Sequence, residues 1–265
     1  MLYVVGTPIG NLKDITLRAL ETLRAVDYIL CEDTRHSLKL LSHYEIKKPL
    51  VAYHKFNERE SAEKVLADLR QGKEIALISD AGMPLISDPG SVLITRVKEE
   101  GLPFTVVPGT TAFVPALILG GMGAPFLFHG FLPDKKKERD AVLRKLKNET
   151  ATLIFYCAPH DMESTVSALY SAFGERTAVA VREITKMYEE STHFTLSKGF
   201  SGAKGEFVLL VSGAEEKDEF AEISVEEHIG QYIAQGLSKM EAIKRVAKER
   251  GVSKSSLYHY TIEEE

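Results

Sequence analysis

The stretch Tyr3–Leu12, YVVGTPIGNL, decides how the chain begins to fold, because an apolar strand pattern runs into a turn containing Gly6, Pro8 and Gly10. A glycine turn after a strand often holds a nucleotide phosphate with its backbone N–H groups. Here the glycines do not complete the G-x-G-x-x-G pattern, and Pro8 lacks the N–H that a phosphate needs. On spacing alone the stretch is more typical of a tight strand-to-helix turn than of a phosphate-binding loop.

The first half of the chain repeats this rhythm of strand and helix. The apolar runs typical of strands are LYVV (2–5), DYILC (27–31), PLVAY (49–53), EIALIS (74–79) and PFTVV (103–107). Between them apolar residues recur at helical spacing, as at Leu17, Leu20 and Leu23. The alternation predicts an α/β domain over 1–120, with a mostly parallel sheet covered by helices.

Three loops rich in glycine and proline follow predicted strands: 6–12, 79–90 and 107–113. The carboxyl ends of parallel strands meet at one edge of a sheet, which is where open α/β sheets bind their ligands. We therefore expect the three loops to line a single cleft.

The second half changes character near GGMGAP (120–125). Strand patterns stand close together there, with helical patterns at Ala141–Leu146 and Met162–Phe173. This predicts a second domain over 121–214 with a mixed or antiparallel sheet. The strand patterns are FLFHGF (126–131), TLIFYCA (152–158), TAVAVR (177–182), STHFTLS (191–197) and EFVLLVS (206–212).

The end of the chain has the pattern of a small helical unit over 222–265. The acidic stretch 214–224 is typical of a solvated linker or helix edge. Two helical patterns then break at Gly236 and Gly251, with Ser238 and Ser253 as expected N-caps, so the unit is helix-turn-helix-like.

Composition sets limits on function. No apolar run reaches the roughly 20 residues of a membrane span, and no signal-peptide pattern follows Met1, so a cytoplasmic protein is expected. A net charge of −5 argues against coating nucleic acid by bulk charge. Cys31 and Cys157 stand in apolar segments without metal-ligand spacing, so core packing is expected and no metal site is predicted.

The loop ISDAGMPLISDPG (78–90) points to the ligand's charge. Asp80 and Asp88 can satisfy nearby backbone N–H groups as ordinary turn residues. Carboxylates and carbonyls in a loop that is poor in donors also suit a cation. S-adenosyl-L-methionine is a ligand of this kind, because it carries a sulfonium and no phosphate. In that interpretation Pro8 forms a wall of the cofactor site.

Seven motifs in order resemble the signature segments of the tetrapyrrole methylase superfamily, and most closely its branch of small-subunit ribosomal RNA 2′-O-ribose cytidine methyltransferases. They are GTPIGNLKDIT, CEDTRHS, LISDAGMPLISDPG, VPGTTA, FHGFLPDKKKER, VREITKMYEE and AKGEFVLLVSG. The resemblance implies two α/β domains, the first Rossmann-like, with S-adenosyl-L-methionine between them. It also implies a homodimer, with ribosomal RNA or an assembled 30S subunit as partner and no membrane.

The resemblance also implies which residues bind the cofactor, position by position. They are Pro8, Asp80, Ala81, Gly82, Met83, Thr110, Thr111, Ala112, Tyr156, Cys157, Ala158 and Gly205. The branch usually has threonine at position 83, glutamate at 157 and arginine at 161, where this chain has Met83, Cys157 and Asp161.

A basic segment and a carboxylate pair complete the predicted site. Lys135, Lys136, Lys137, Arg139 and Lys204 are candidate RNA contacts, although a lysine-rich solvated helix face has the same composition. Methyl transfer to a ribose hydroxyl needs help in removing a proton. We therefore predict Asp33 or Glu32 as the carboxylate near the hydroxyl, with Arg35 and Lys186 on substrate phosphates; an interdomain ion-pair network is the alternative.

Two other functions fit the same motifs. One is a methyltransferase acting on a small tetrapyrrole, which the basic segment and the tail disfavour. The other is a non-catalytic RNA-binding relative, which Met83, Cys157 and Asp161 leave open and the intact cofactor loops disfavour.

Overall fold

The computed structural model describes residues 1–201, 204–215 and 223–261. By their contacts these fall into two compact units, 1–214 and 215–265, each considered by itself. Residues 216–222, which include most of the expected acidic linker, lie outside the described residues.

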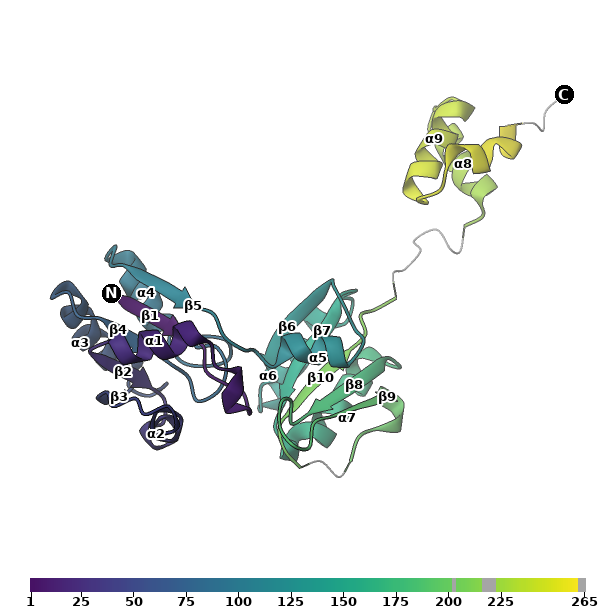
Figure 1. The fold of residues 1–265 in the computed structure, drawn as a ribbon. Helices are drawn as coiled ribbons and strands as arrows, with labels where there is room; N and C mark the ends of the chain where they lie inside the picture. Colours follow the sequence, from purple (N-terminus) through teal and green to yellow (C-terminus); the bar gives the residue numbers. More distant parts are fainter. Residues whose placement is uncertain (202–203, 216–222, 262–265) are drawn as a thin grey trace. The chain divides into compact units, whose positions relative to one another are not determined.

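The first sheet is fully parallel, with strand order β3-β2-β4-β1-β5 (Figure 1). All the strand patterns expected in the first half form strands of this sheet. Its strands are β1 (Leu2–Val5), β2 (Tyr28–Cys31), β3 (Leu50–Ala52), β4 (Ile75–Leu77) and β5 (Phe104–Val107).

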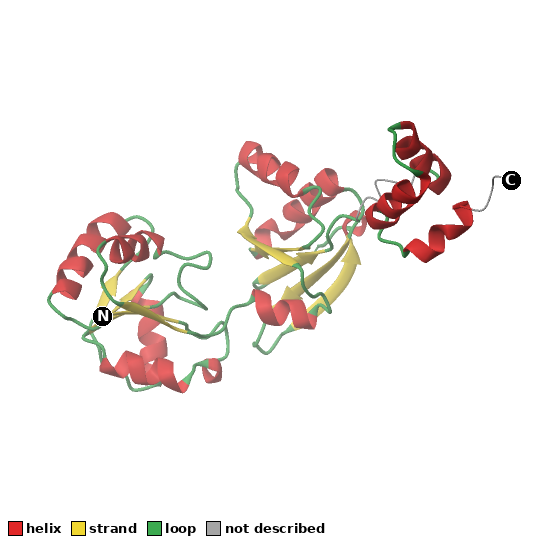
Figure 2. Cartoon of the chain, turned by 90° about the horizontal axis from the view of Figure 1, so that it is seen from above, coloured by secondary structure: helices red, strands yellow, loops and turns green. Residues whose placement is uncertain are grey.

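Helices cover both faces of this sheet because successive strand residues point to opposite sides. Ile29 packs with α1 (Leu17–Ala25) and α2 (Thr34–His43) on one face. Leu30 packs with α3 (Glu58–Arg70) and α4 (Ser91–Glu99) on the other. The result is the predicted parallel sheet covered by helices, which leaves the carboxyl ends of the strands to the loops (Figure 2).

The second sheet is mixed, with order β6-β7-β10-β8-β9. Only the pair β6 and β7 is parallel among its neighbouring strands. The strands are β6 (Phe126–Phe131), β7 (Thr152–Cys157), β8 (Thr177–Arg182), β9 (Glu190–Thr195) and β10 (Phe207–Val211). The central strand β10 is buried along its whole length, as expected of a strand covered on both faces.

Helices α6 (Lys136–Leu146) and α7 (Met162–Phe173) cover one face of the second sheet. Helix α5 (Phe113–Leu119) packs on its other face through Ala116 and Leu117. The change from one sheet to the other therefore comes before α5, earlier than the GGMGAP segment. Cys31 and Cys157 are buried and unbonded, as core packing requires.

The C-terminal unit consists of α8 (Val225–Ala234), α9 (Lys239–Glu249) and a 3-10 segment (Lys254–Thr261) around a small apolar core. Ser238 caps α9 as expected, in a reciprocal capping box with Glu241. The Ser253 hydroxyl accepts the Ser256 N–H at the start of the last segment.

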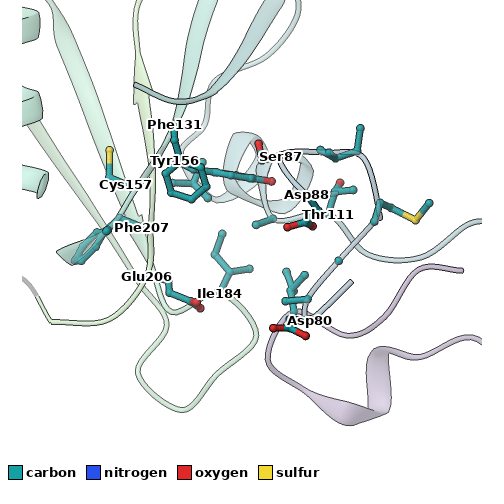
Figure 3. A pocket seen from close by; sticks show the side chains of 18 of the residues that line it. Asp80, Ser87, Asp88, Thr111, Phe131, Tyr156, Cys157, Ile184, Glu206 and Phe207 are labelled. Atoms are coloured by element: carbon teal, nitrogen blue, oxygen red, sulfur yellow. The ribbon is translucent and has the colours of Figure 1, made fainter. Parts of the chain in front are cut away.

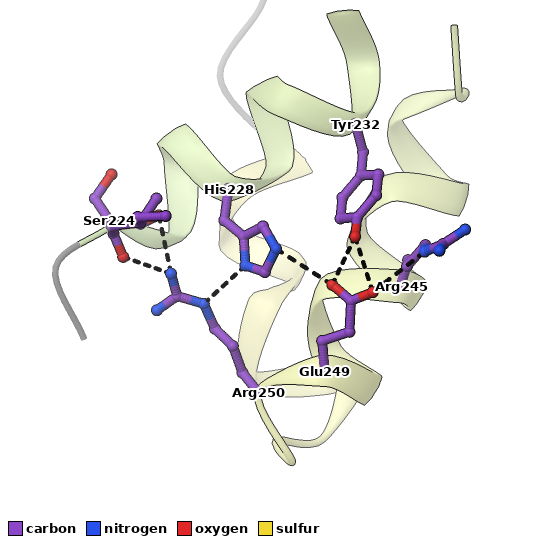
Figure 4. Close-up of polar contacts among 7 residues, drawn as sticks. Ser224, His228, Tyr232, Arg245, Glu249 and Arg250 are labelled. Atoms are coloured by element: carbon purple, nitrogen blue, oxygen red, sulfur yellow. Dashed lines mark hydrogen bonds and ion pairs between the residues drawn. The ribbon is translucent and has the colours of Figure 1, made fainter. Parts of the chain in front are cut away.

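Polar contacts fasten α8 to the end of α9 around the nearly buried His228 (Figure 4). Arg250 donates to His228 Nδ1 at 3.3 Å, and His228 Nε2 lies 3.2 Å from Glu249. Glu249 also accepts from the Tyr232 hydroxyl at 2.8 Å and from Arg245 at 3.2 Å. Its carboxylate is thus held by three side chains, and these bonds lower its pKa, with the bond from Tyr232 contributing most.

Candidate functional site

The three glycine- and proline-rich loops are hydrogen-bonded to one another through Thr7, whose side chain is buried. Thr7 N–H donates to Gly82 O at 2.8 Å, and Gly82 N–H donates back to Thr7 O at 3.2 Å. The Thr110 hydroxyl donates to the same Thr7 carbonyl at 2.9 Å. Loops 6–12, 79–90 and 107–113 therefore form one assembly at the carboxyl edge of the first sheet.

Gly6 and Gly109 pass so closely that neither could carry a side chain. A Cβ built on Gly6 would lie 2.6 Å from Gly109 Cα, and one built on Gly109 would lie 2.8 Å from Gly6 Cα. Real Cβ atoms essentially never approach backbone this closely, so the two loops depend on glycine at both positions.

A cavity of about 500 Å³ lies between this loop assembly and the second sheet (Figure 3). The loops that follow the strands of the first sheet contribute Ile9, Glu32, Asp80, Ala81, Gly82, Met83, Ile86, Ser87, Asp88, Thr111 and Ala112. From the second sheet the cavity is lined by Phe131, Tyr156, Cys157, Ala158, Pro159, Ile184, Lys186, Glu206, Phe207 and Val208. Both halves of the larger unit thus contribute to one site.

The cavity brings together most of the expected cofactor residues. Those that line it are Asp80, Ala81, Gly82, Met83, Thr111, Ala112, Tyr156, Cys157 and Ala158. Pro8, Thr110 and Gly205 are not among the lining residues. The wall contributed by the first loop is Ile9 rather than Pro8, which is buried, while Thr110 is turned toward the Thr7 carbonyl.

Gly205 has a supporting place beside the cavity. A Cβ there would lie 2.7 Å from the Glu183 carboxylate, and its φ of +94° favours glycine. Glu183 in turn accepts from Lys186 Nζ at 3.0 Å, and Lys186 lies 2.6 Å from Glu206. Gly205 therefore leaves room for the ion pairs that hold Lys186 at the cavity.

Three carboxylates gather on one side of the cavity: Glu32, Asp80 and Asp88. Burial, with repulsion from Asp80, raises the pKa of Glu32. Burial, with repulsion from Glu32, raises the pKa of Asp88 to about 6. A bound cation would relieve this repulsion, so the electrostatics of the cavity favour a positively charged ligand.

Asp33 and Arg35 are bound to each other instead of lining the cavity. Asp33 caps α2 by accepting the Arg35 N–H at 2.8 Å, and the Arg35 guanidinium lies 2.9 Å from the same carboxylate. These bonds from Arg35 lower the pKa of Asp33 to about 2. A carboxylate held in this way is a weak proton acceptor.

Two segments that line the cavity carry backbone strain. Leu85 and Ser87 have φ of 72°, and Glu183 and Thr185 have φ of 50° and 66°. Positive φ is rare for residues other than glycine, and a β-branched threonine there is an outlier. Such strain clusters at functional sites, where the surrounding structure holds it in place.

The expected RNA-contacting residues lie outside this cavity, but some border neighbouring ones. Arg139 lines a cavity of about 570 Å³ that shares Phe131, Tyr156, Cys157 and Ala158 with the first. Its buried Nε has no hydrogen-bond partner among the described residues. Lys204 lines a third cavity with His160, and Lys135, Lys136 and Lys137 are exposed at the start of α6.

The cavity also contains residues that the sequence motifs did not single out as ligands. The sequence pattern allows Asp88 to be a turn residue, and it gives no separate signal for Ile9, Ser87, Phe131, Ile184 and Glu206.

In the residues that the structure describes, no group of His, Cys, Asp and Glu side chains is arranged to hold a metal ion. Within the same ranges, no helix has the length and apolar character needed to cross a membrane.

Sequence comparison finds close relatives of this chain. A model of the family described as Tetrapyrrole (Corrin/Porphyrin) Methylases matches residues 1–198. A protein of Halalkalibacterium halodurans named Ribosomal RNA small subunit methyltransferase I is 44% identical over 97% of this chain and 93% of its own length. A Thermotoga maritima protein of the same name is 41% identical, over 81% of this chain and 99% of its own length.

Structural comparison finds the same fold in enzymes with different names. A uroporphyrin-III C-methyltransferase from Thermus thermophilus complexed with S-adenosyl homocysteine has a TM-score of 0.56 at 19% identity, over 79% of this chain and 96% of that one. A diphthine synthase has a TM-score of 0.61 at 14% identity, over 80% and 89%. At these identities the likeness is one of fold.

Proposed function

The chain belongs to the tetrapyrrole (corrin/porphyrin) methylase family, in the branch of the small-subunit ribosomal RNA methyltransferases, and from this premise we propose that it transfers a methyl group from S-adenosyl-L-methionine to a cytidine 2′-hydroxyl of small-subunit ribosomal RNA. The observation that carries the proposal is the cavity at which the expected cofactor loops meet. As the resemblance implies, the protein would act as a homodimer.

The residues of the cavity fit this cofactor. Glu32, Asp80 and Asp88 offer negative charge to a ligand that carries a sulfonium and an ammonium group. The side chains of Ile9, Ile184 and Phe207 offer apolar surface to the adenosine of the cofactor. When bound, the cofactor supplies an activated methyl group on a good leaving group, so the protein's own task is to orient the acceptor and remove its proton.

Of the two carboxylates expected near the ribose hydroxyl, Glu32 is the better placed for that proton. It lines the cavity, and its raised pKa makes it a stronger proton acceptor than Asp33. Lys186, held between Glu183 and Glu206, lines the same cavity from the loop that follows β8. We propose Glu32 as the general base and Lys186 as a contact to the substrate phosphate.

Cofactor affinity should rise with pH between 5 and 7. Asp88 has a pKa of about 6, so it is largely neutral at pH 5 and largely ionised at pH 7. A cation binds the ionised form better, and the cofactor's amino group titrates only near pH 8. Calorimetry should show the dissociation constant falling by up to about tenfold over this range. Asp88→Asn should flatten the profile; an unchanged slope in that variant would show that Asp88 does not face the cation.

The basic segment should supply contacts to RNA phosphates. Each lysine that neutralises a phosphate adds about 0.7 to 0.9 to the slope of log affinity against log salt. Replacing Lys135, Lys136 and Lys137 by alanine should therefore lower that slope by about 2. The matched triple variant of Lys239, Lys244 and Lys248 on α9 tests whether the C-terminal unit shares this role. A slope unchanged by the first variant would contradict the phosphate assignment.

The competing functions are distinguished by substrate. A transfer assay with labelled cofactor offers purified small ribosomal subunits, free ribosomal RNA and a tetrapyrrole precursor in parallel. Label on RNA supports the proposal, and label on the tetrapyrrole alone overturns it. Cofactor binding without label on any acceptor would support the non-catalytic alternative.

A further inference from the structure

The loop Glu183–Glu189, between β8 and β9, is held rigidly beside the cavity. Thr185 N–H donates to the Glu189 carboxylate at 2.7 Å, and Glu189 N–H donates to Lys186 O at 3.2 Å. From the first loop, Asn11 N–H donates to the Thr185 hydroxyl at 3.1 Å. These bonds maintain positive φ at Glu183 and Thr185, which would otherwise relax.

The loop presents two kinds of side chain in sequence. Lys186 lines the cavity and is ion-paired. The next two residues, Met187 and Tyr188, are 88% and 69% exposed. Within the described part of the chain, no hydrogen bond or ring contact engages the Tyr188 side chain. A constrained loop thus holds an aromatic ring and a thioether in solvent, next to a residue of the cavity.

The charges around Met187 and Tyr188, at the tip of the loop, favour contact with an uncharged group. Glu189 is exposed, Glu183 and Glu206 share the single cation of Lys186, and Glu190 is paired with Arg182 at 2.8 Å. At Met187 and Tyr188 themselves, beyond Lys186, these carboxylates disfavour a contact to a phosphate group. A flat aromatic group can instead stack on the Tyr188 ring and contact the Met187 thioether. Nucleobases of single-stranded RNA stack on aromatic side chains in this way.

Resting on the proposed function, we propose that Tyr188, supported by Met187, stacks on a nucleobase adjacent to the nucleotide that is methylated. The stacked base fixes the strand at the cavity, with Lys186 two residues earlier in the same loop as the contact to the RNA backbone. Tyr188 is in this account a positioning residue, because the ring takes no part in the transfer itself.

The chain contains no tryptophan, which allows a direct test by fluorescence. Tyr188→Trp creates a single reporter at the loop tip, and Tyr170→Trp creates a matched reporter on α7, where Tyr170 is 44% exposed. Stacking should quench Tyr188→Trp when a single-stranded RNA oligonucleotide is added. An abasic oligonucleotide of the same length, and either oligonucleotide with Tyr170→Trp, should leave the signal unchanged. Equal quenching by the abasic oligonucleotide, or none by either, would overturn the proposal.

Kinetics separate this inference from the function on which it rests. Stacking contributes about 1 to 3 kcal/mol per base, so Tyr188→Ala and Tyr188→Leu should raise KM for small subunits at least about fivefold. Cofactor affinity should not change, and Tyr188→Phe should restore KM. A normal KM in Tyr188→Ala, in a preparation whose wild type is active, would overturn the stacking role alone. An inactive wild type would contradict the proposed function, with the fluorescence result still deciding whether Tyr188 binds bases.

Discussion

Gly6→Ala should abolish measurable cofactor binding and lower the free energy of unfolding by about 2 to 3 kcal/mol. The new Cβ would lie 2.6 Å from Gly109 Cα and 2.6 Å from Met83 Sδ. The Met83 thioether can move. The Gly109 backbone cannot, because the chain two residues before it is bonded to Gly6, whose N–H donates to Val107 O at 3.0 Å. The two loops must separate, and the cavity that they line with loop 79–90 loses its shape.

The control is Gly123→Ala, since a Cβ at Gly123 meets nothing within 4 Å. Urea unfolding and calorimetric titration with S-adenosyl-L-methionine should show Gly123→Ala close to wild type. If Gly6→Ala binds the cofactor with an affinity within about threefold of wild type, the close approach of Gly6 to Gly109 is not needed for the site.

Glu32→Gln should reduce kcat by at least about a hundredfold at saturating cofactor, while Asp33→Asn remains within a few-fold of wild type. Glutamine keeps the shape of the half-buried Glu32 side chain but cannot accept the proton. Asparagine can still cap α2 in place of Asp33, so that variant should fold normally.

Single-turnover rates of the two variants, with bound cofactor measured separately, make the comparison. Loss of turnover in Asp33→Asn with Glu32→Gln active would reverse the assignment. Retained turnover in both would remove this carboxylate pair from proton transfer and leave Asp80, Asp88 and Glu206 as the cavity carboxylates to test.

The strands could be predicted from sequence because they depend on local patterns. The meeting of the loops then followed from the expected parallel sheet. Alternating apolar runs mark strands, and parallel strands bring their carboxyl ends to one edge. The helix expected at Ala141–Leu146 begins earlier, at Lys136. Its first turns are solvated and lysine-rich, so they lack the apolar periodicity by which a helix is recognised.

Which residue of a loop faces the cavity could not be predicted, because it depends on backbone conformation. Asp88 reaches the cavity through a loop in which Leu85 and Ser87 adopt positive φ, and no residue type there signals it. Ile9 lines the cavity where Pro8 was expected, and Glu206 and Phe207 enter from the start of β10, where the pattern showed only a strand.

The position of the transferred methyl group distinguishes ribose methylation from the alternatives. Small ribosomal subunits are incubated with the protein and labelled S-adenosyl-L-methionine, and the RNA is then hydrolysed with alkali. A ribose methylated at its 2′-oxygen resists cleavage, so we expect label in an alkali-stable dinucleotide that contains cytidine. The label should be absent when Gly6→Ala is used. Label released in mononucleotides, or no label in the RNA, would contradict the proposed 2′-O-methylation.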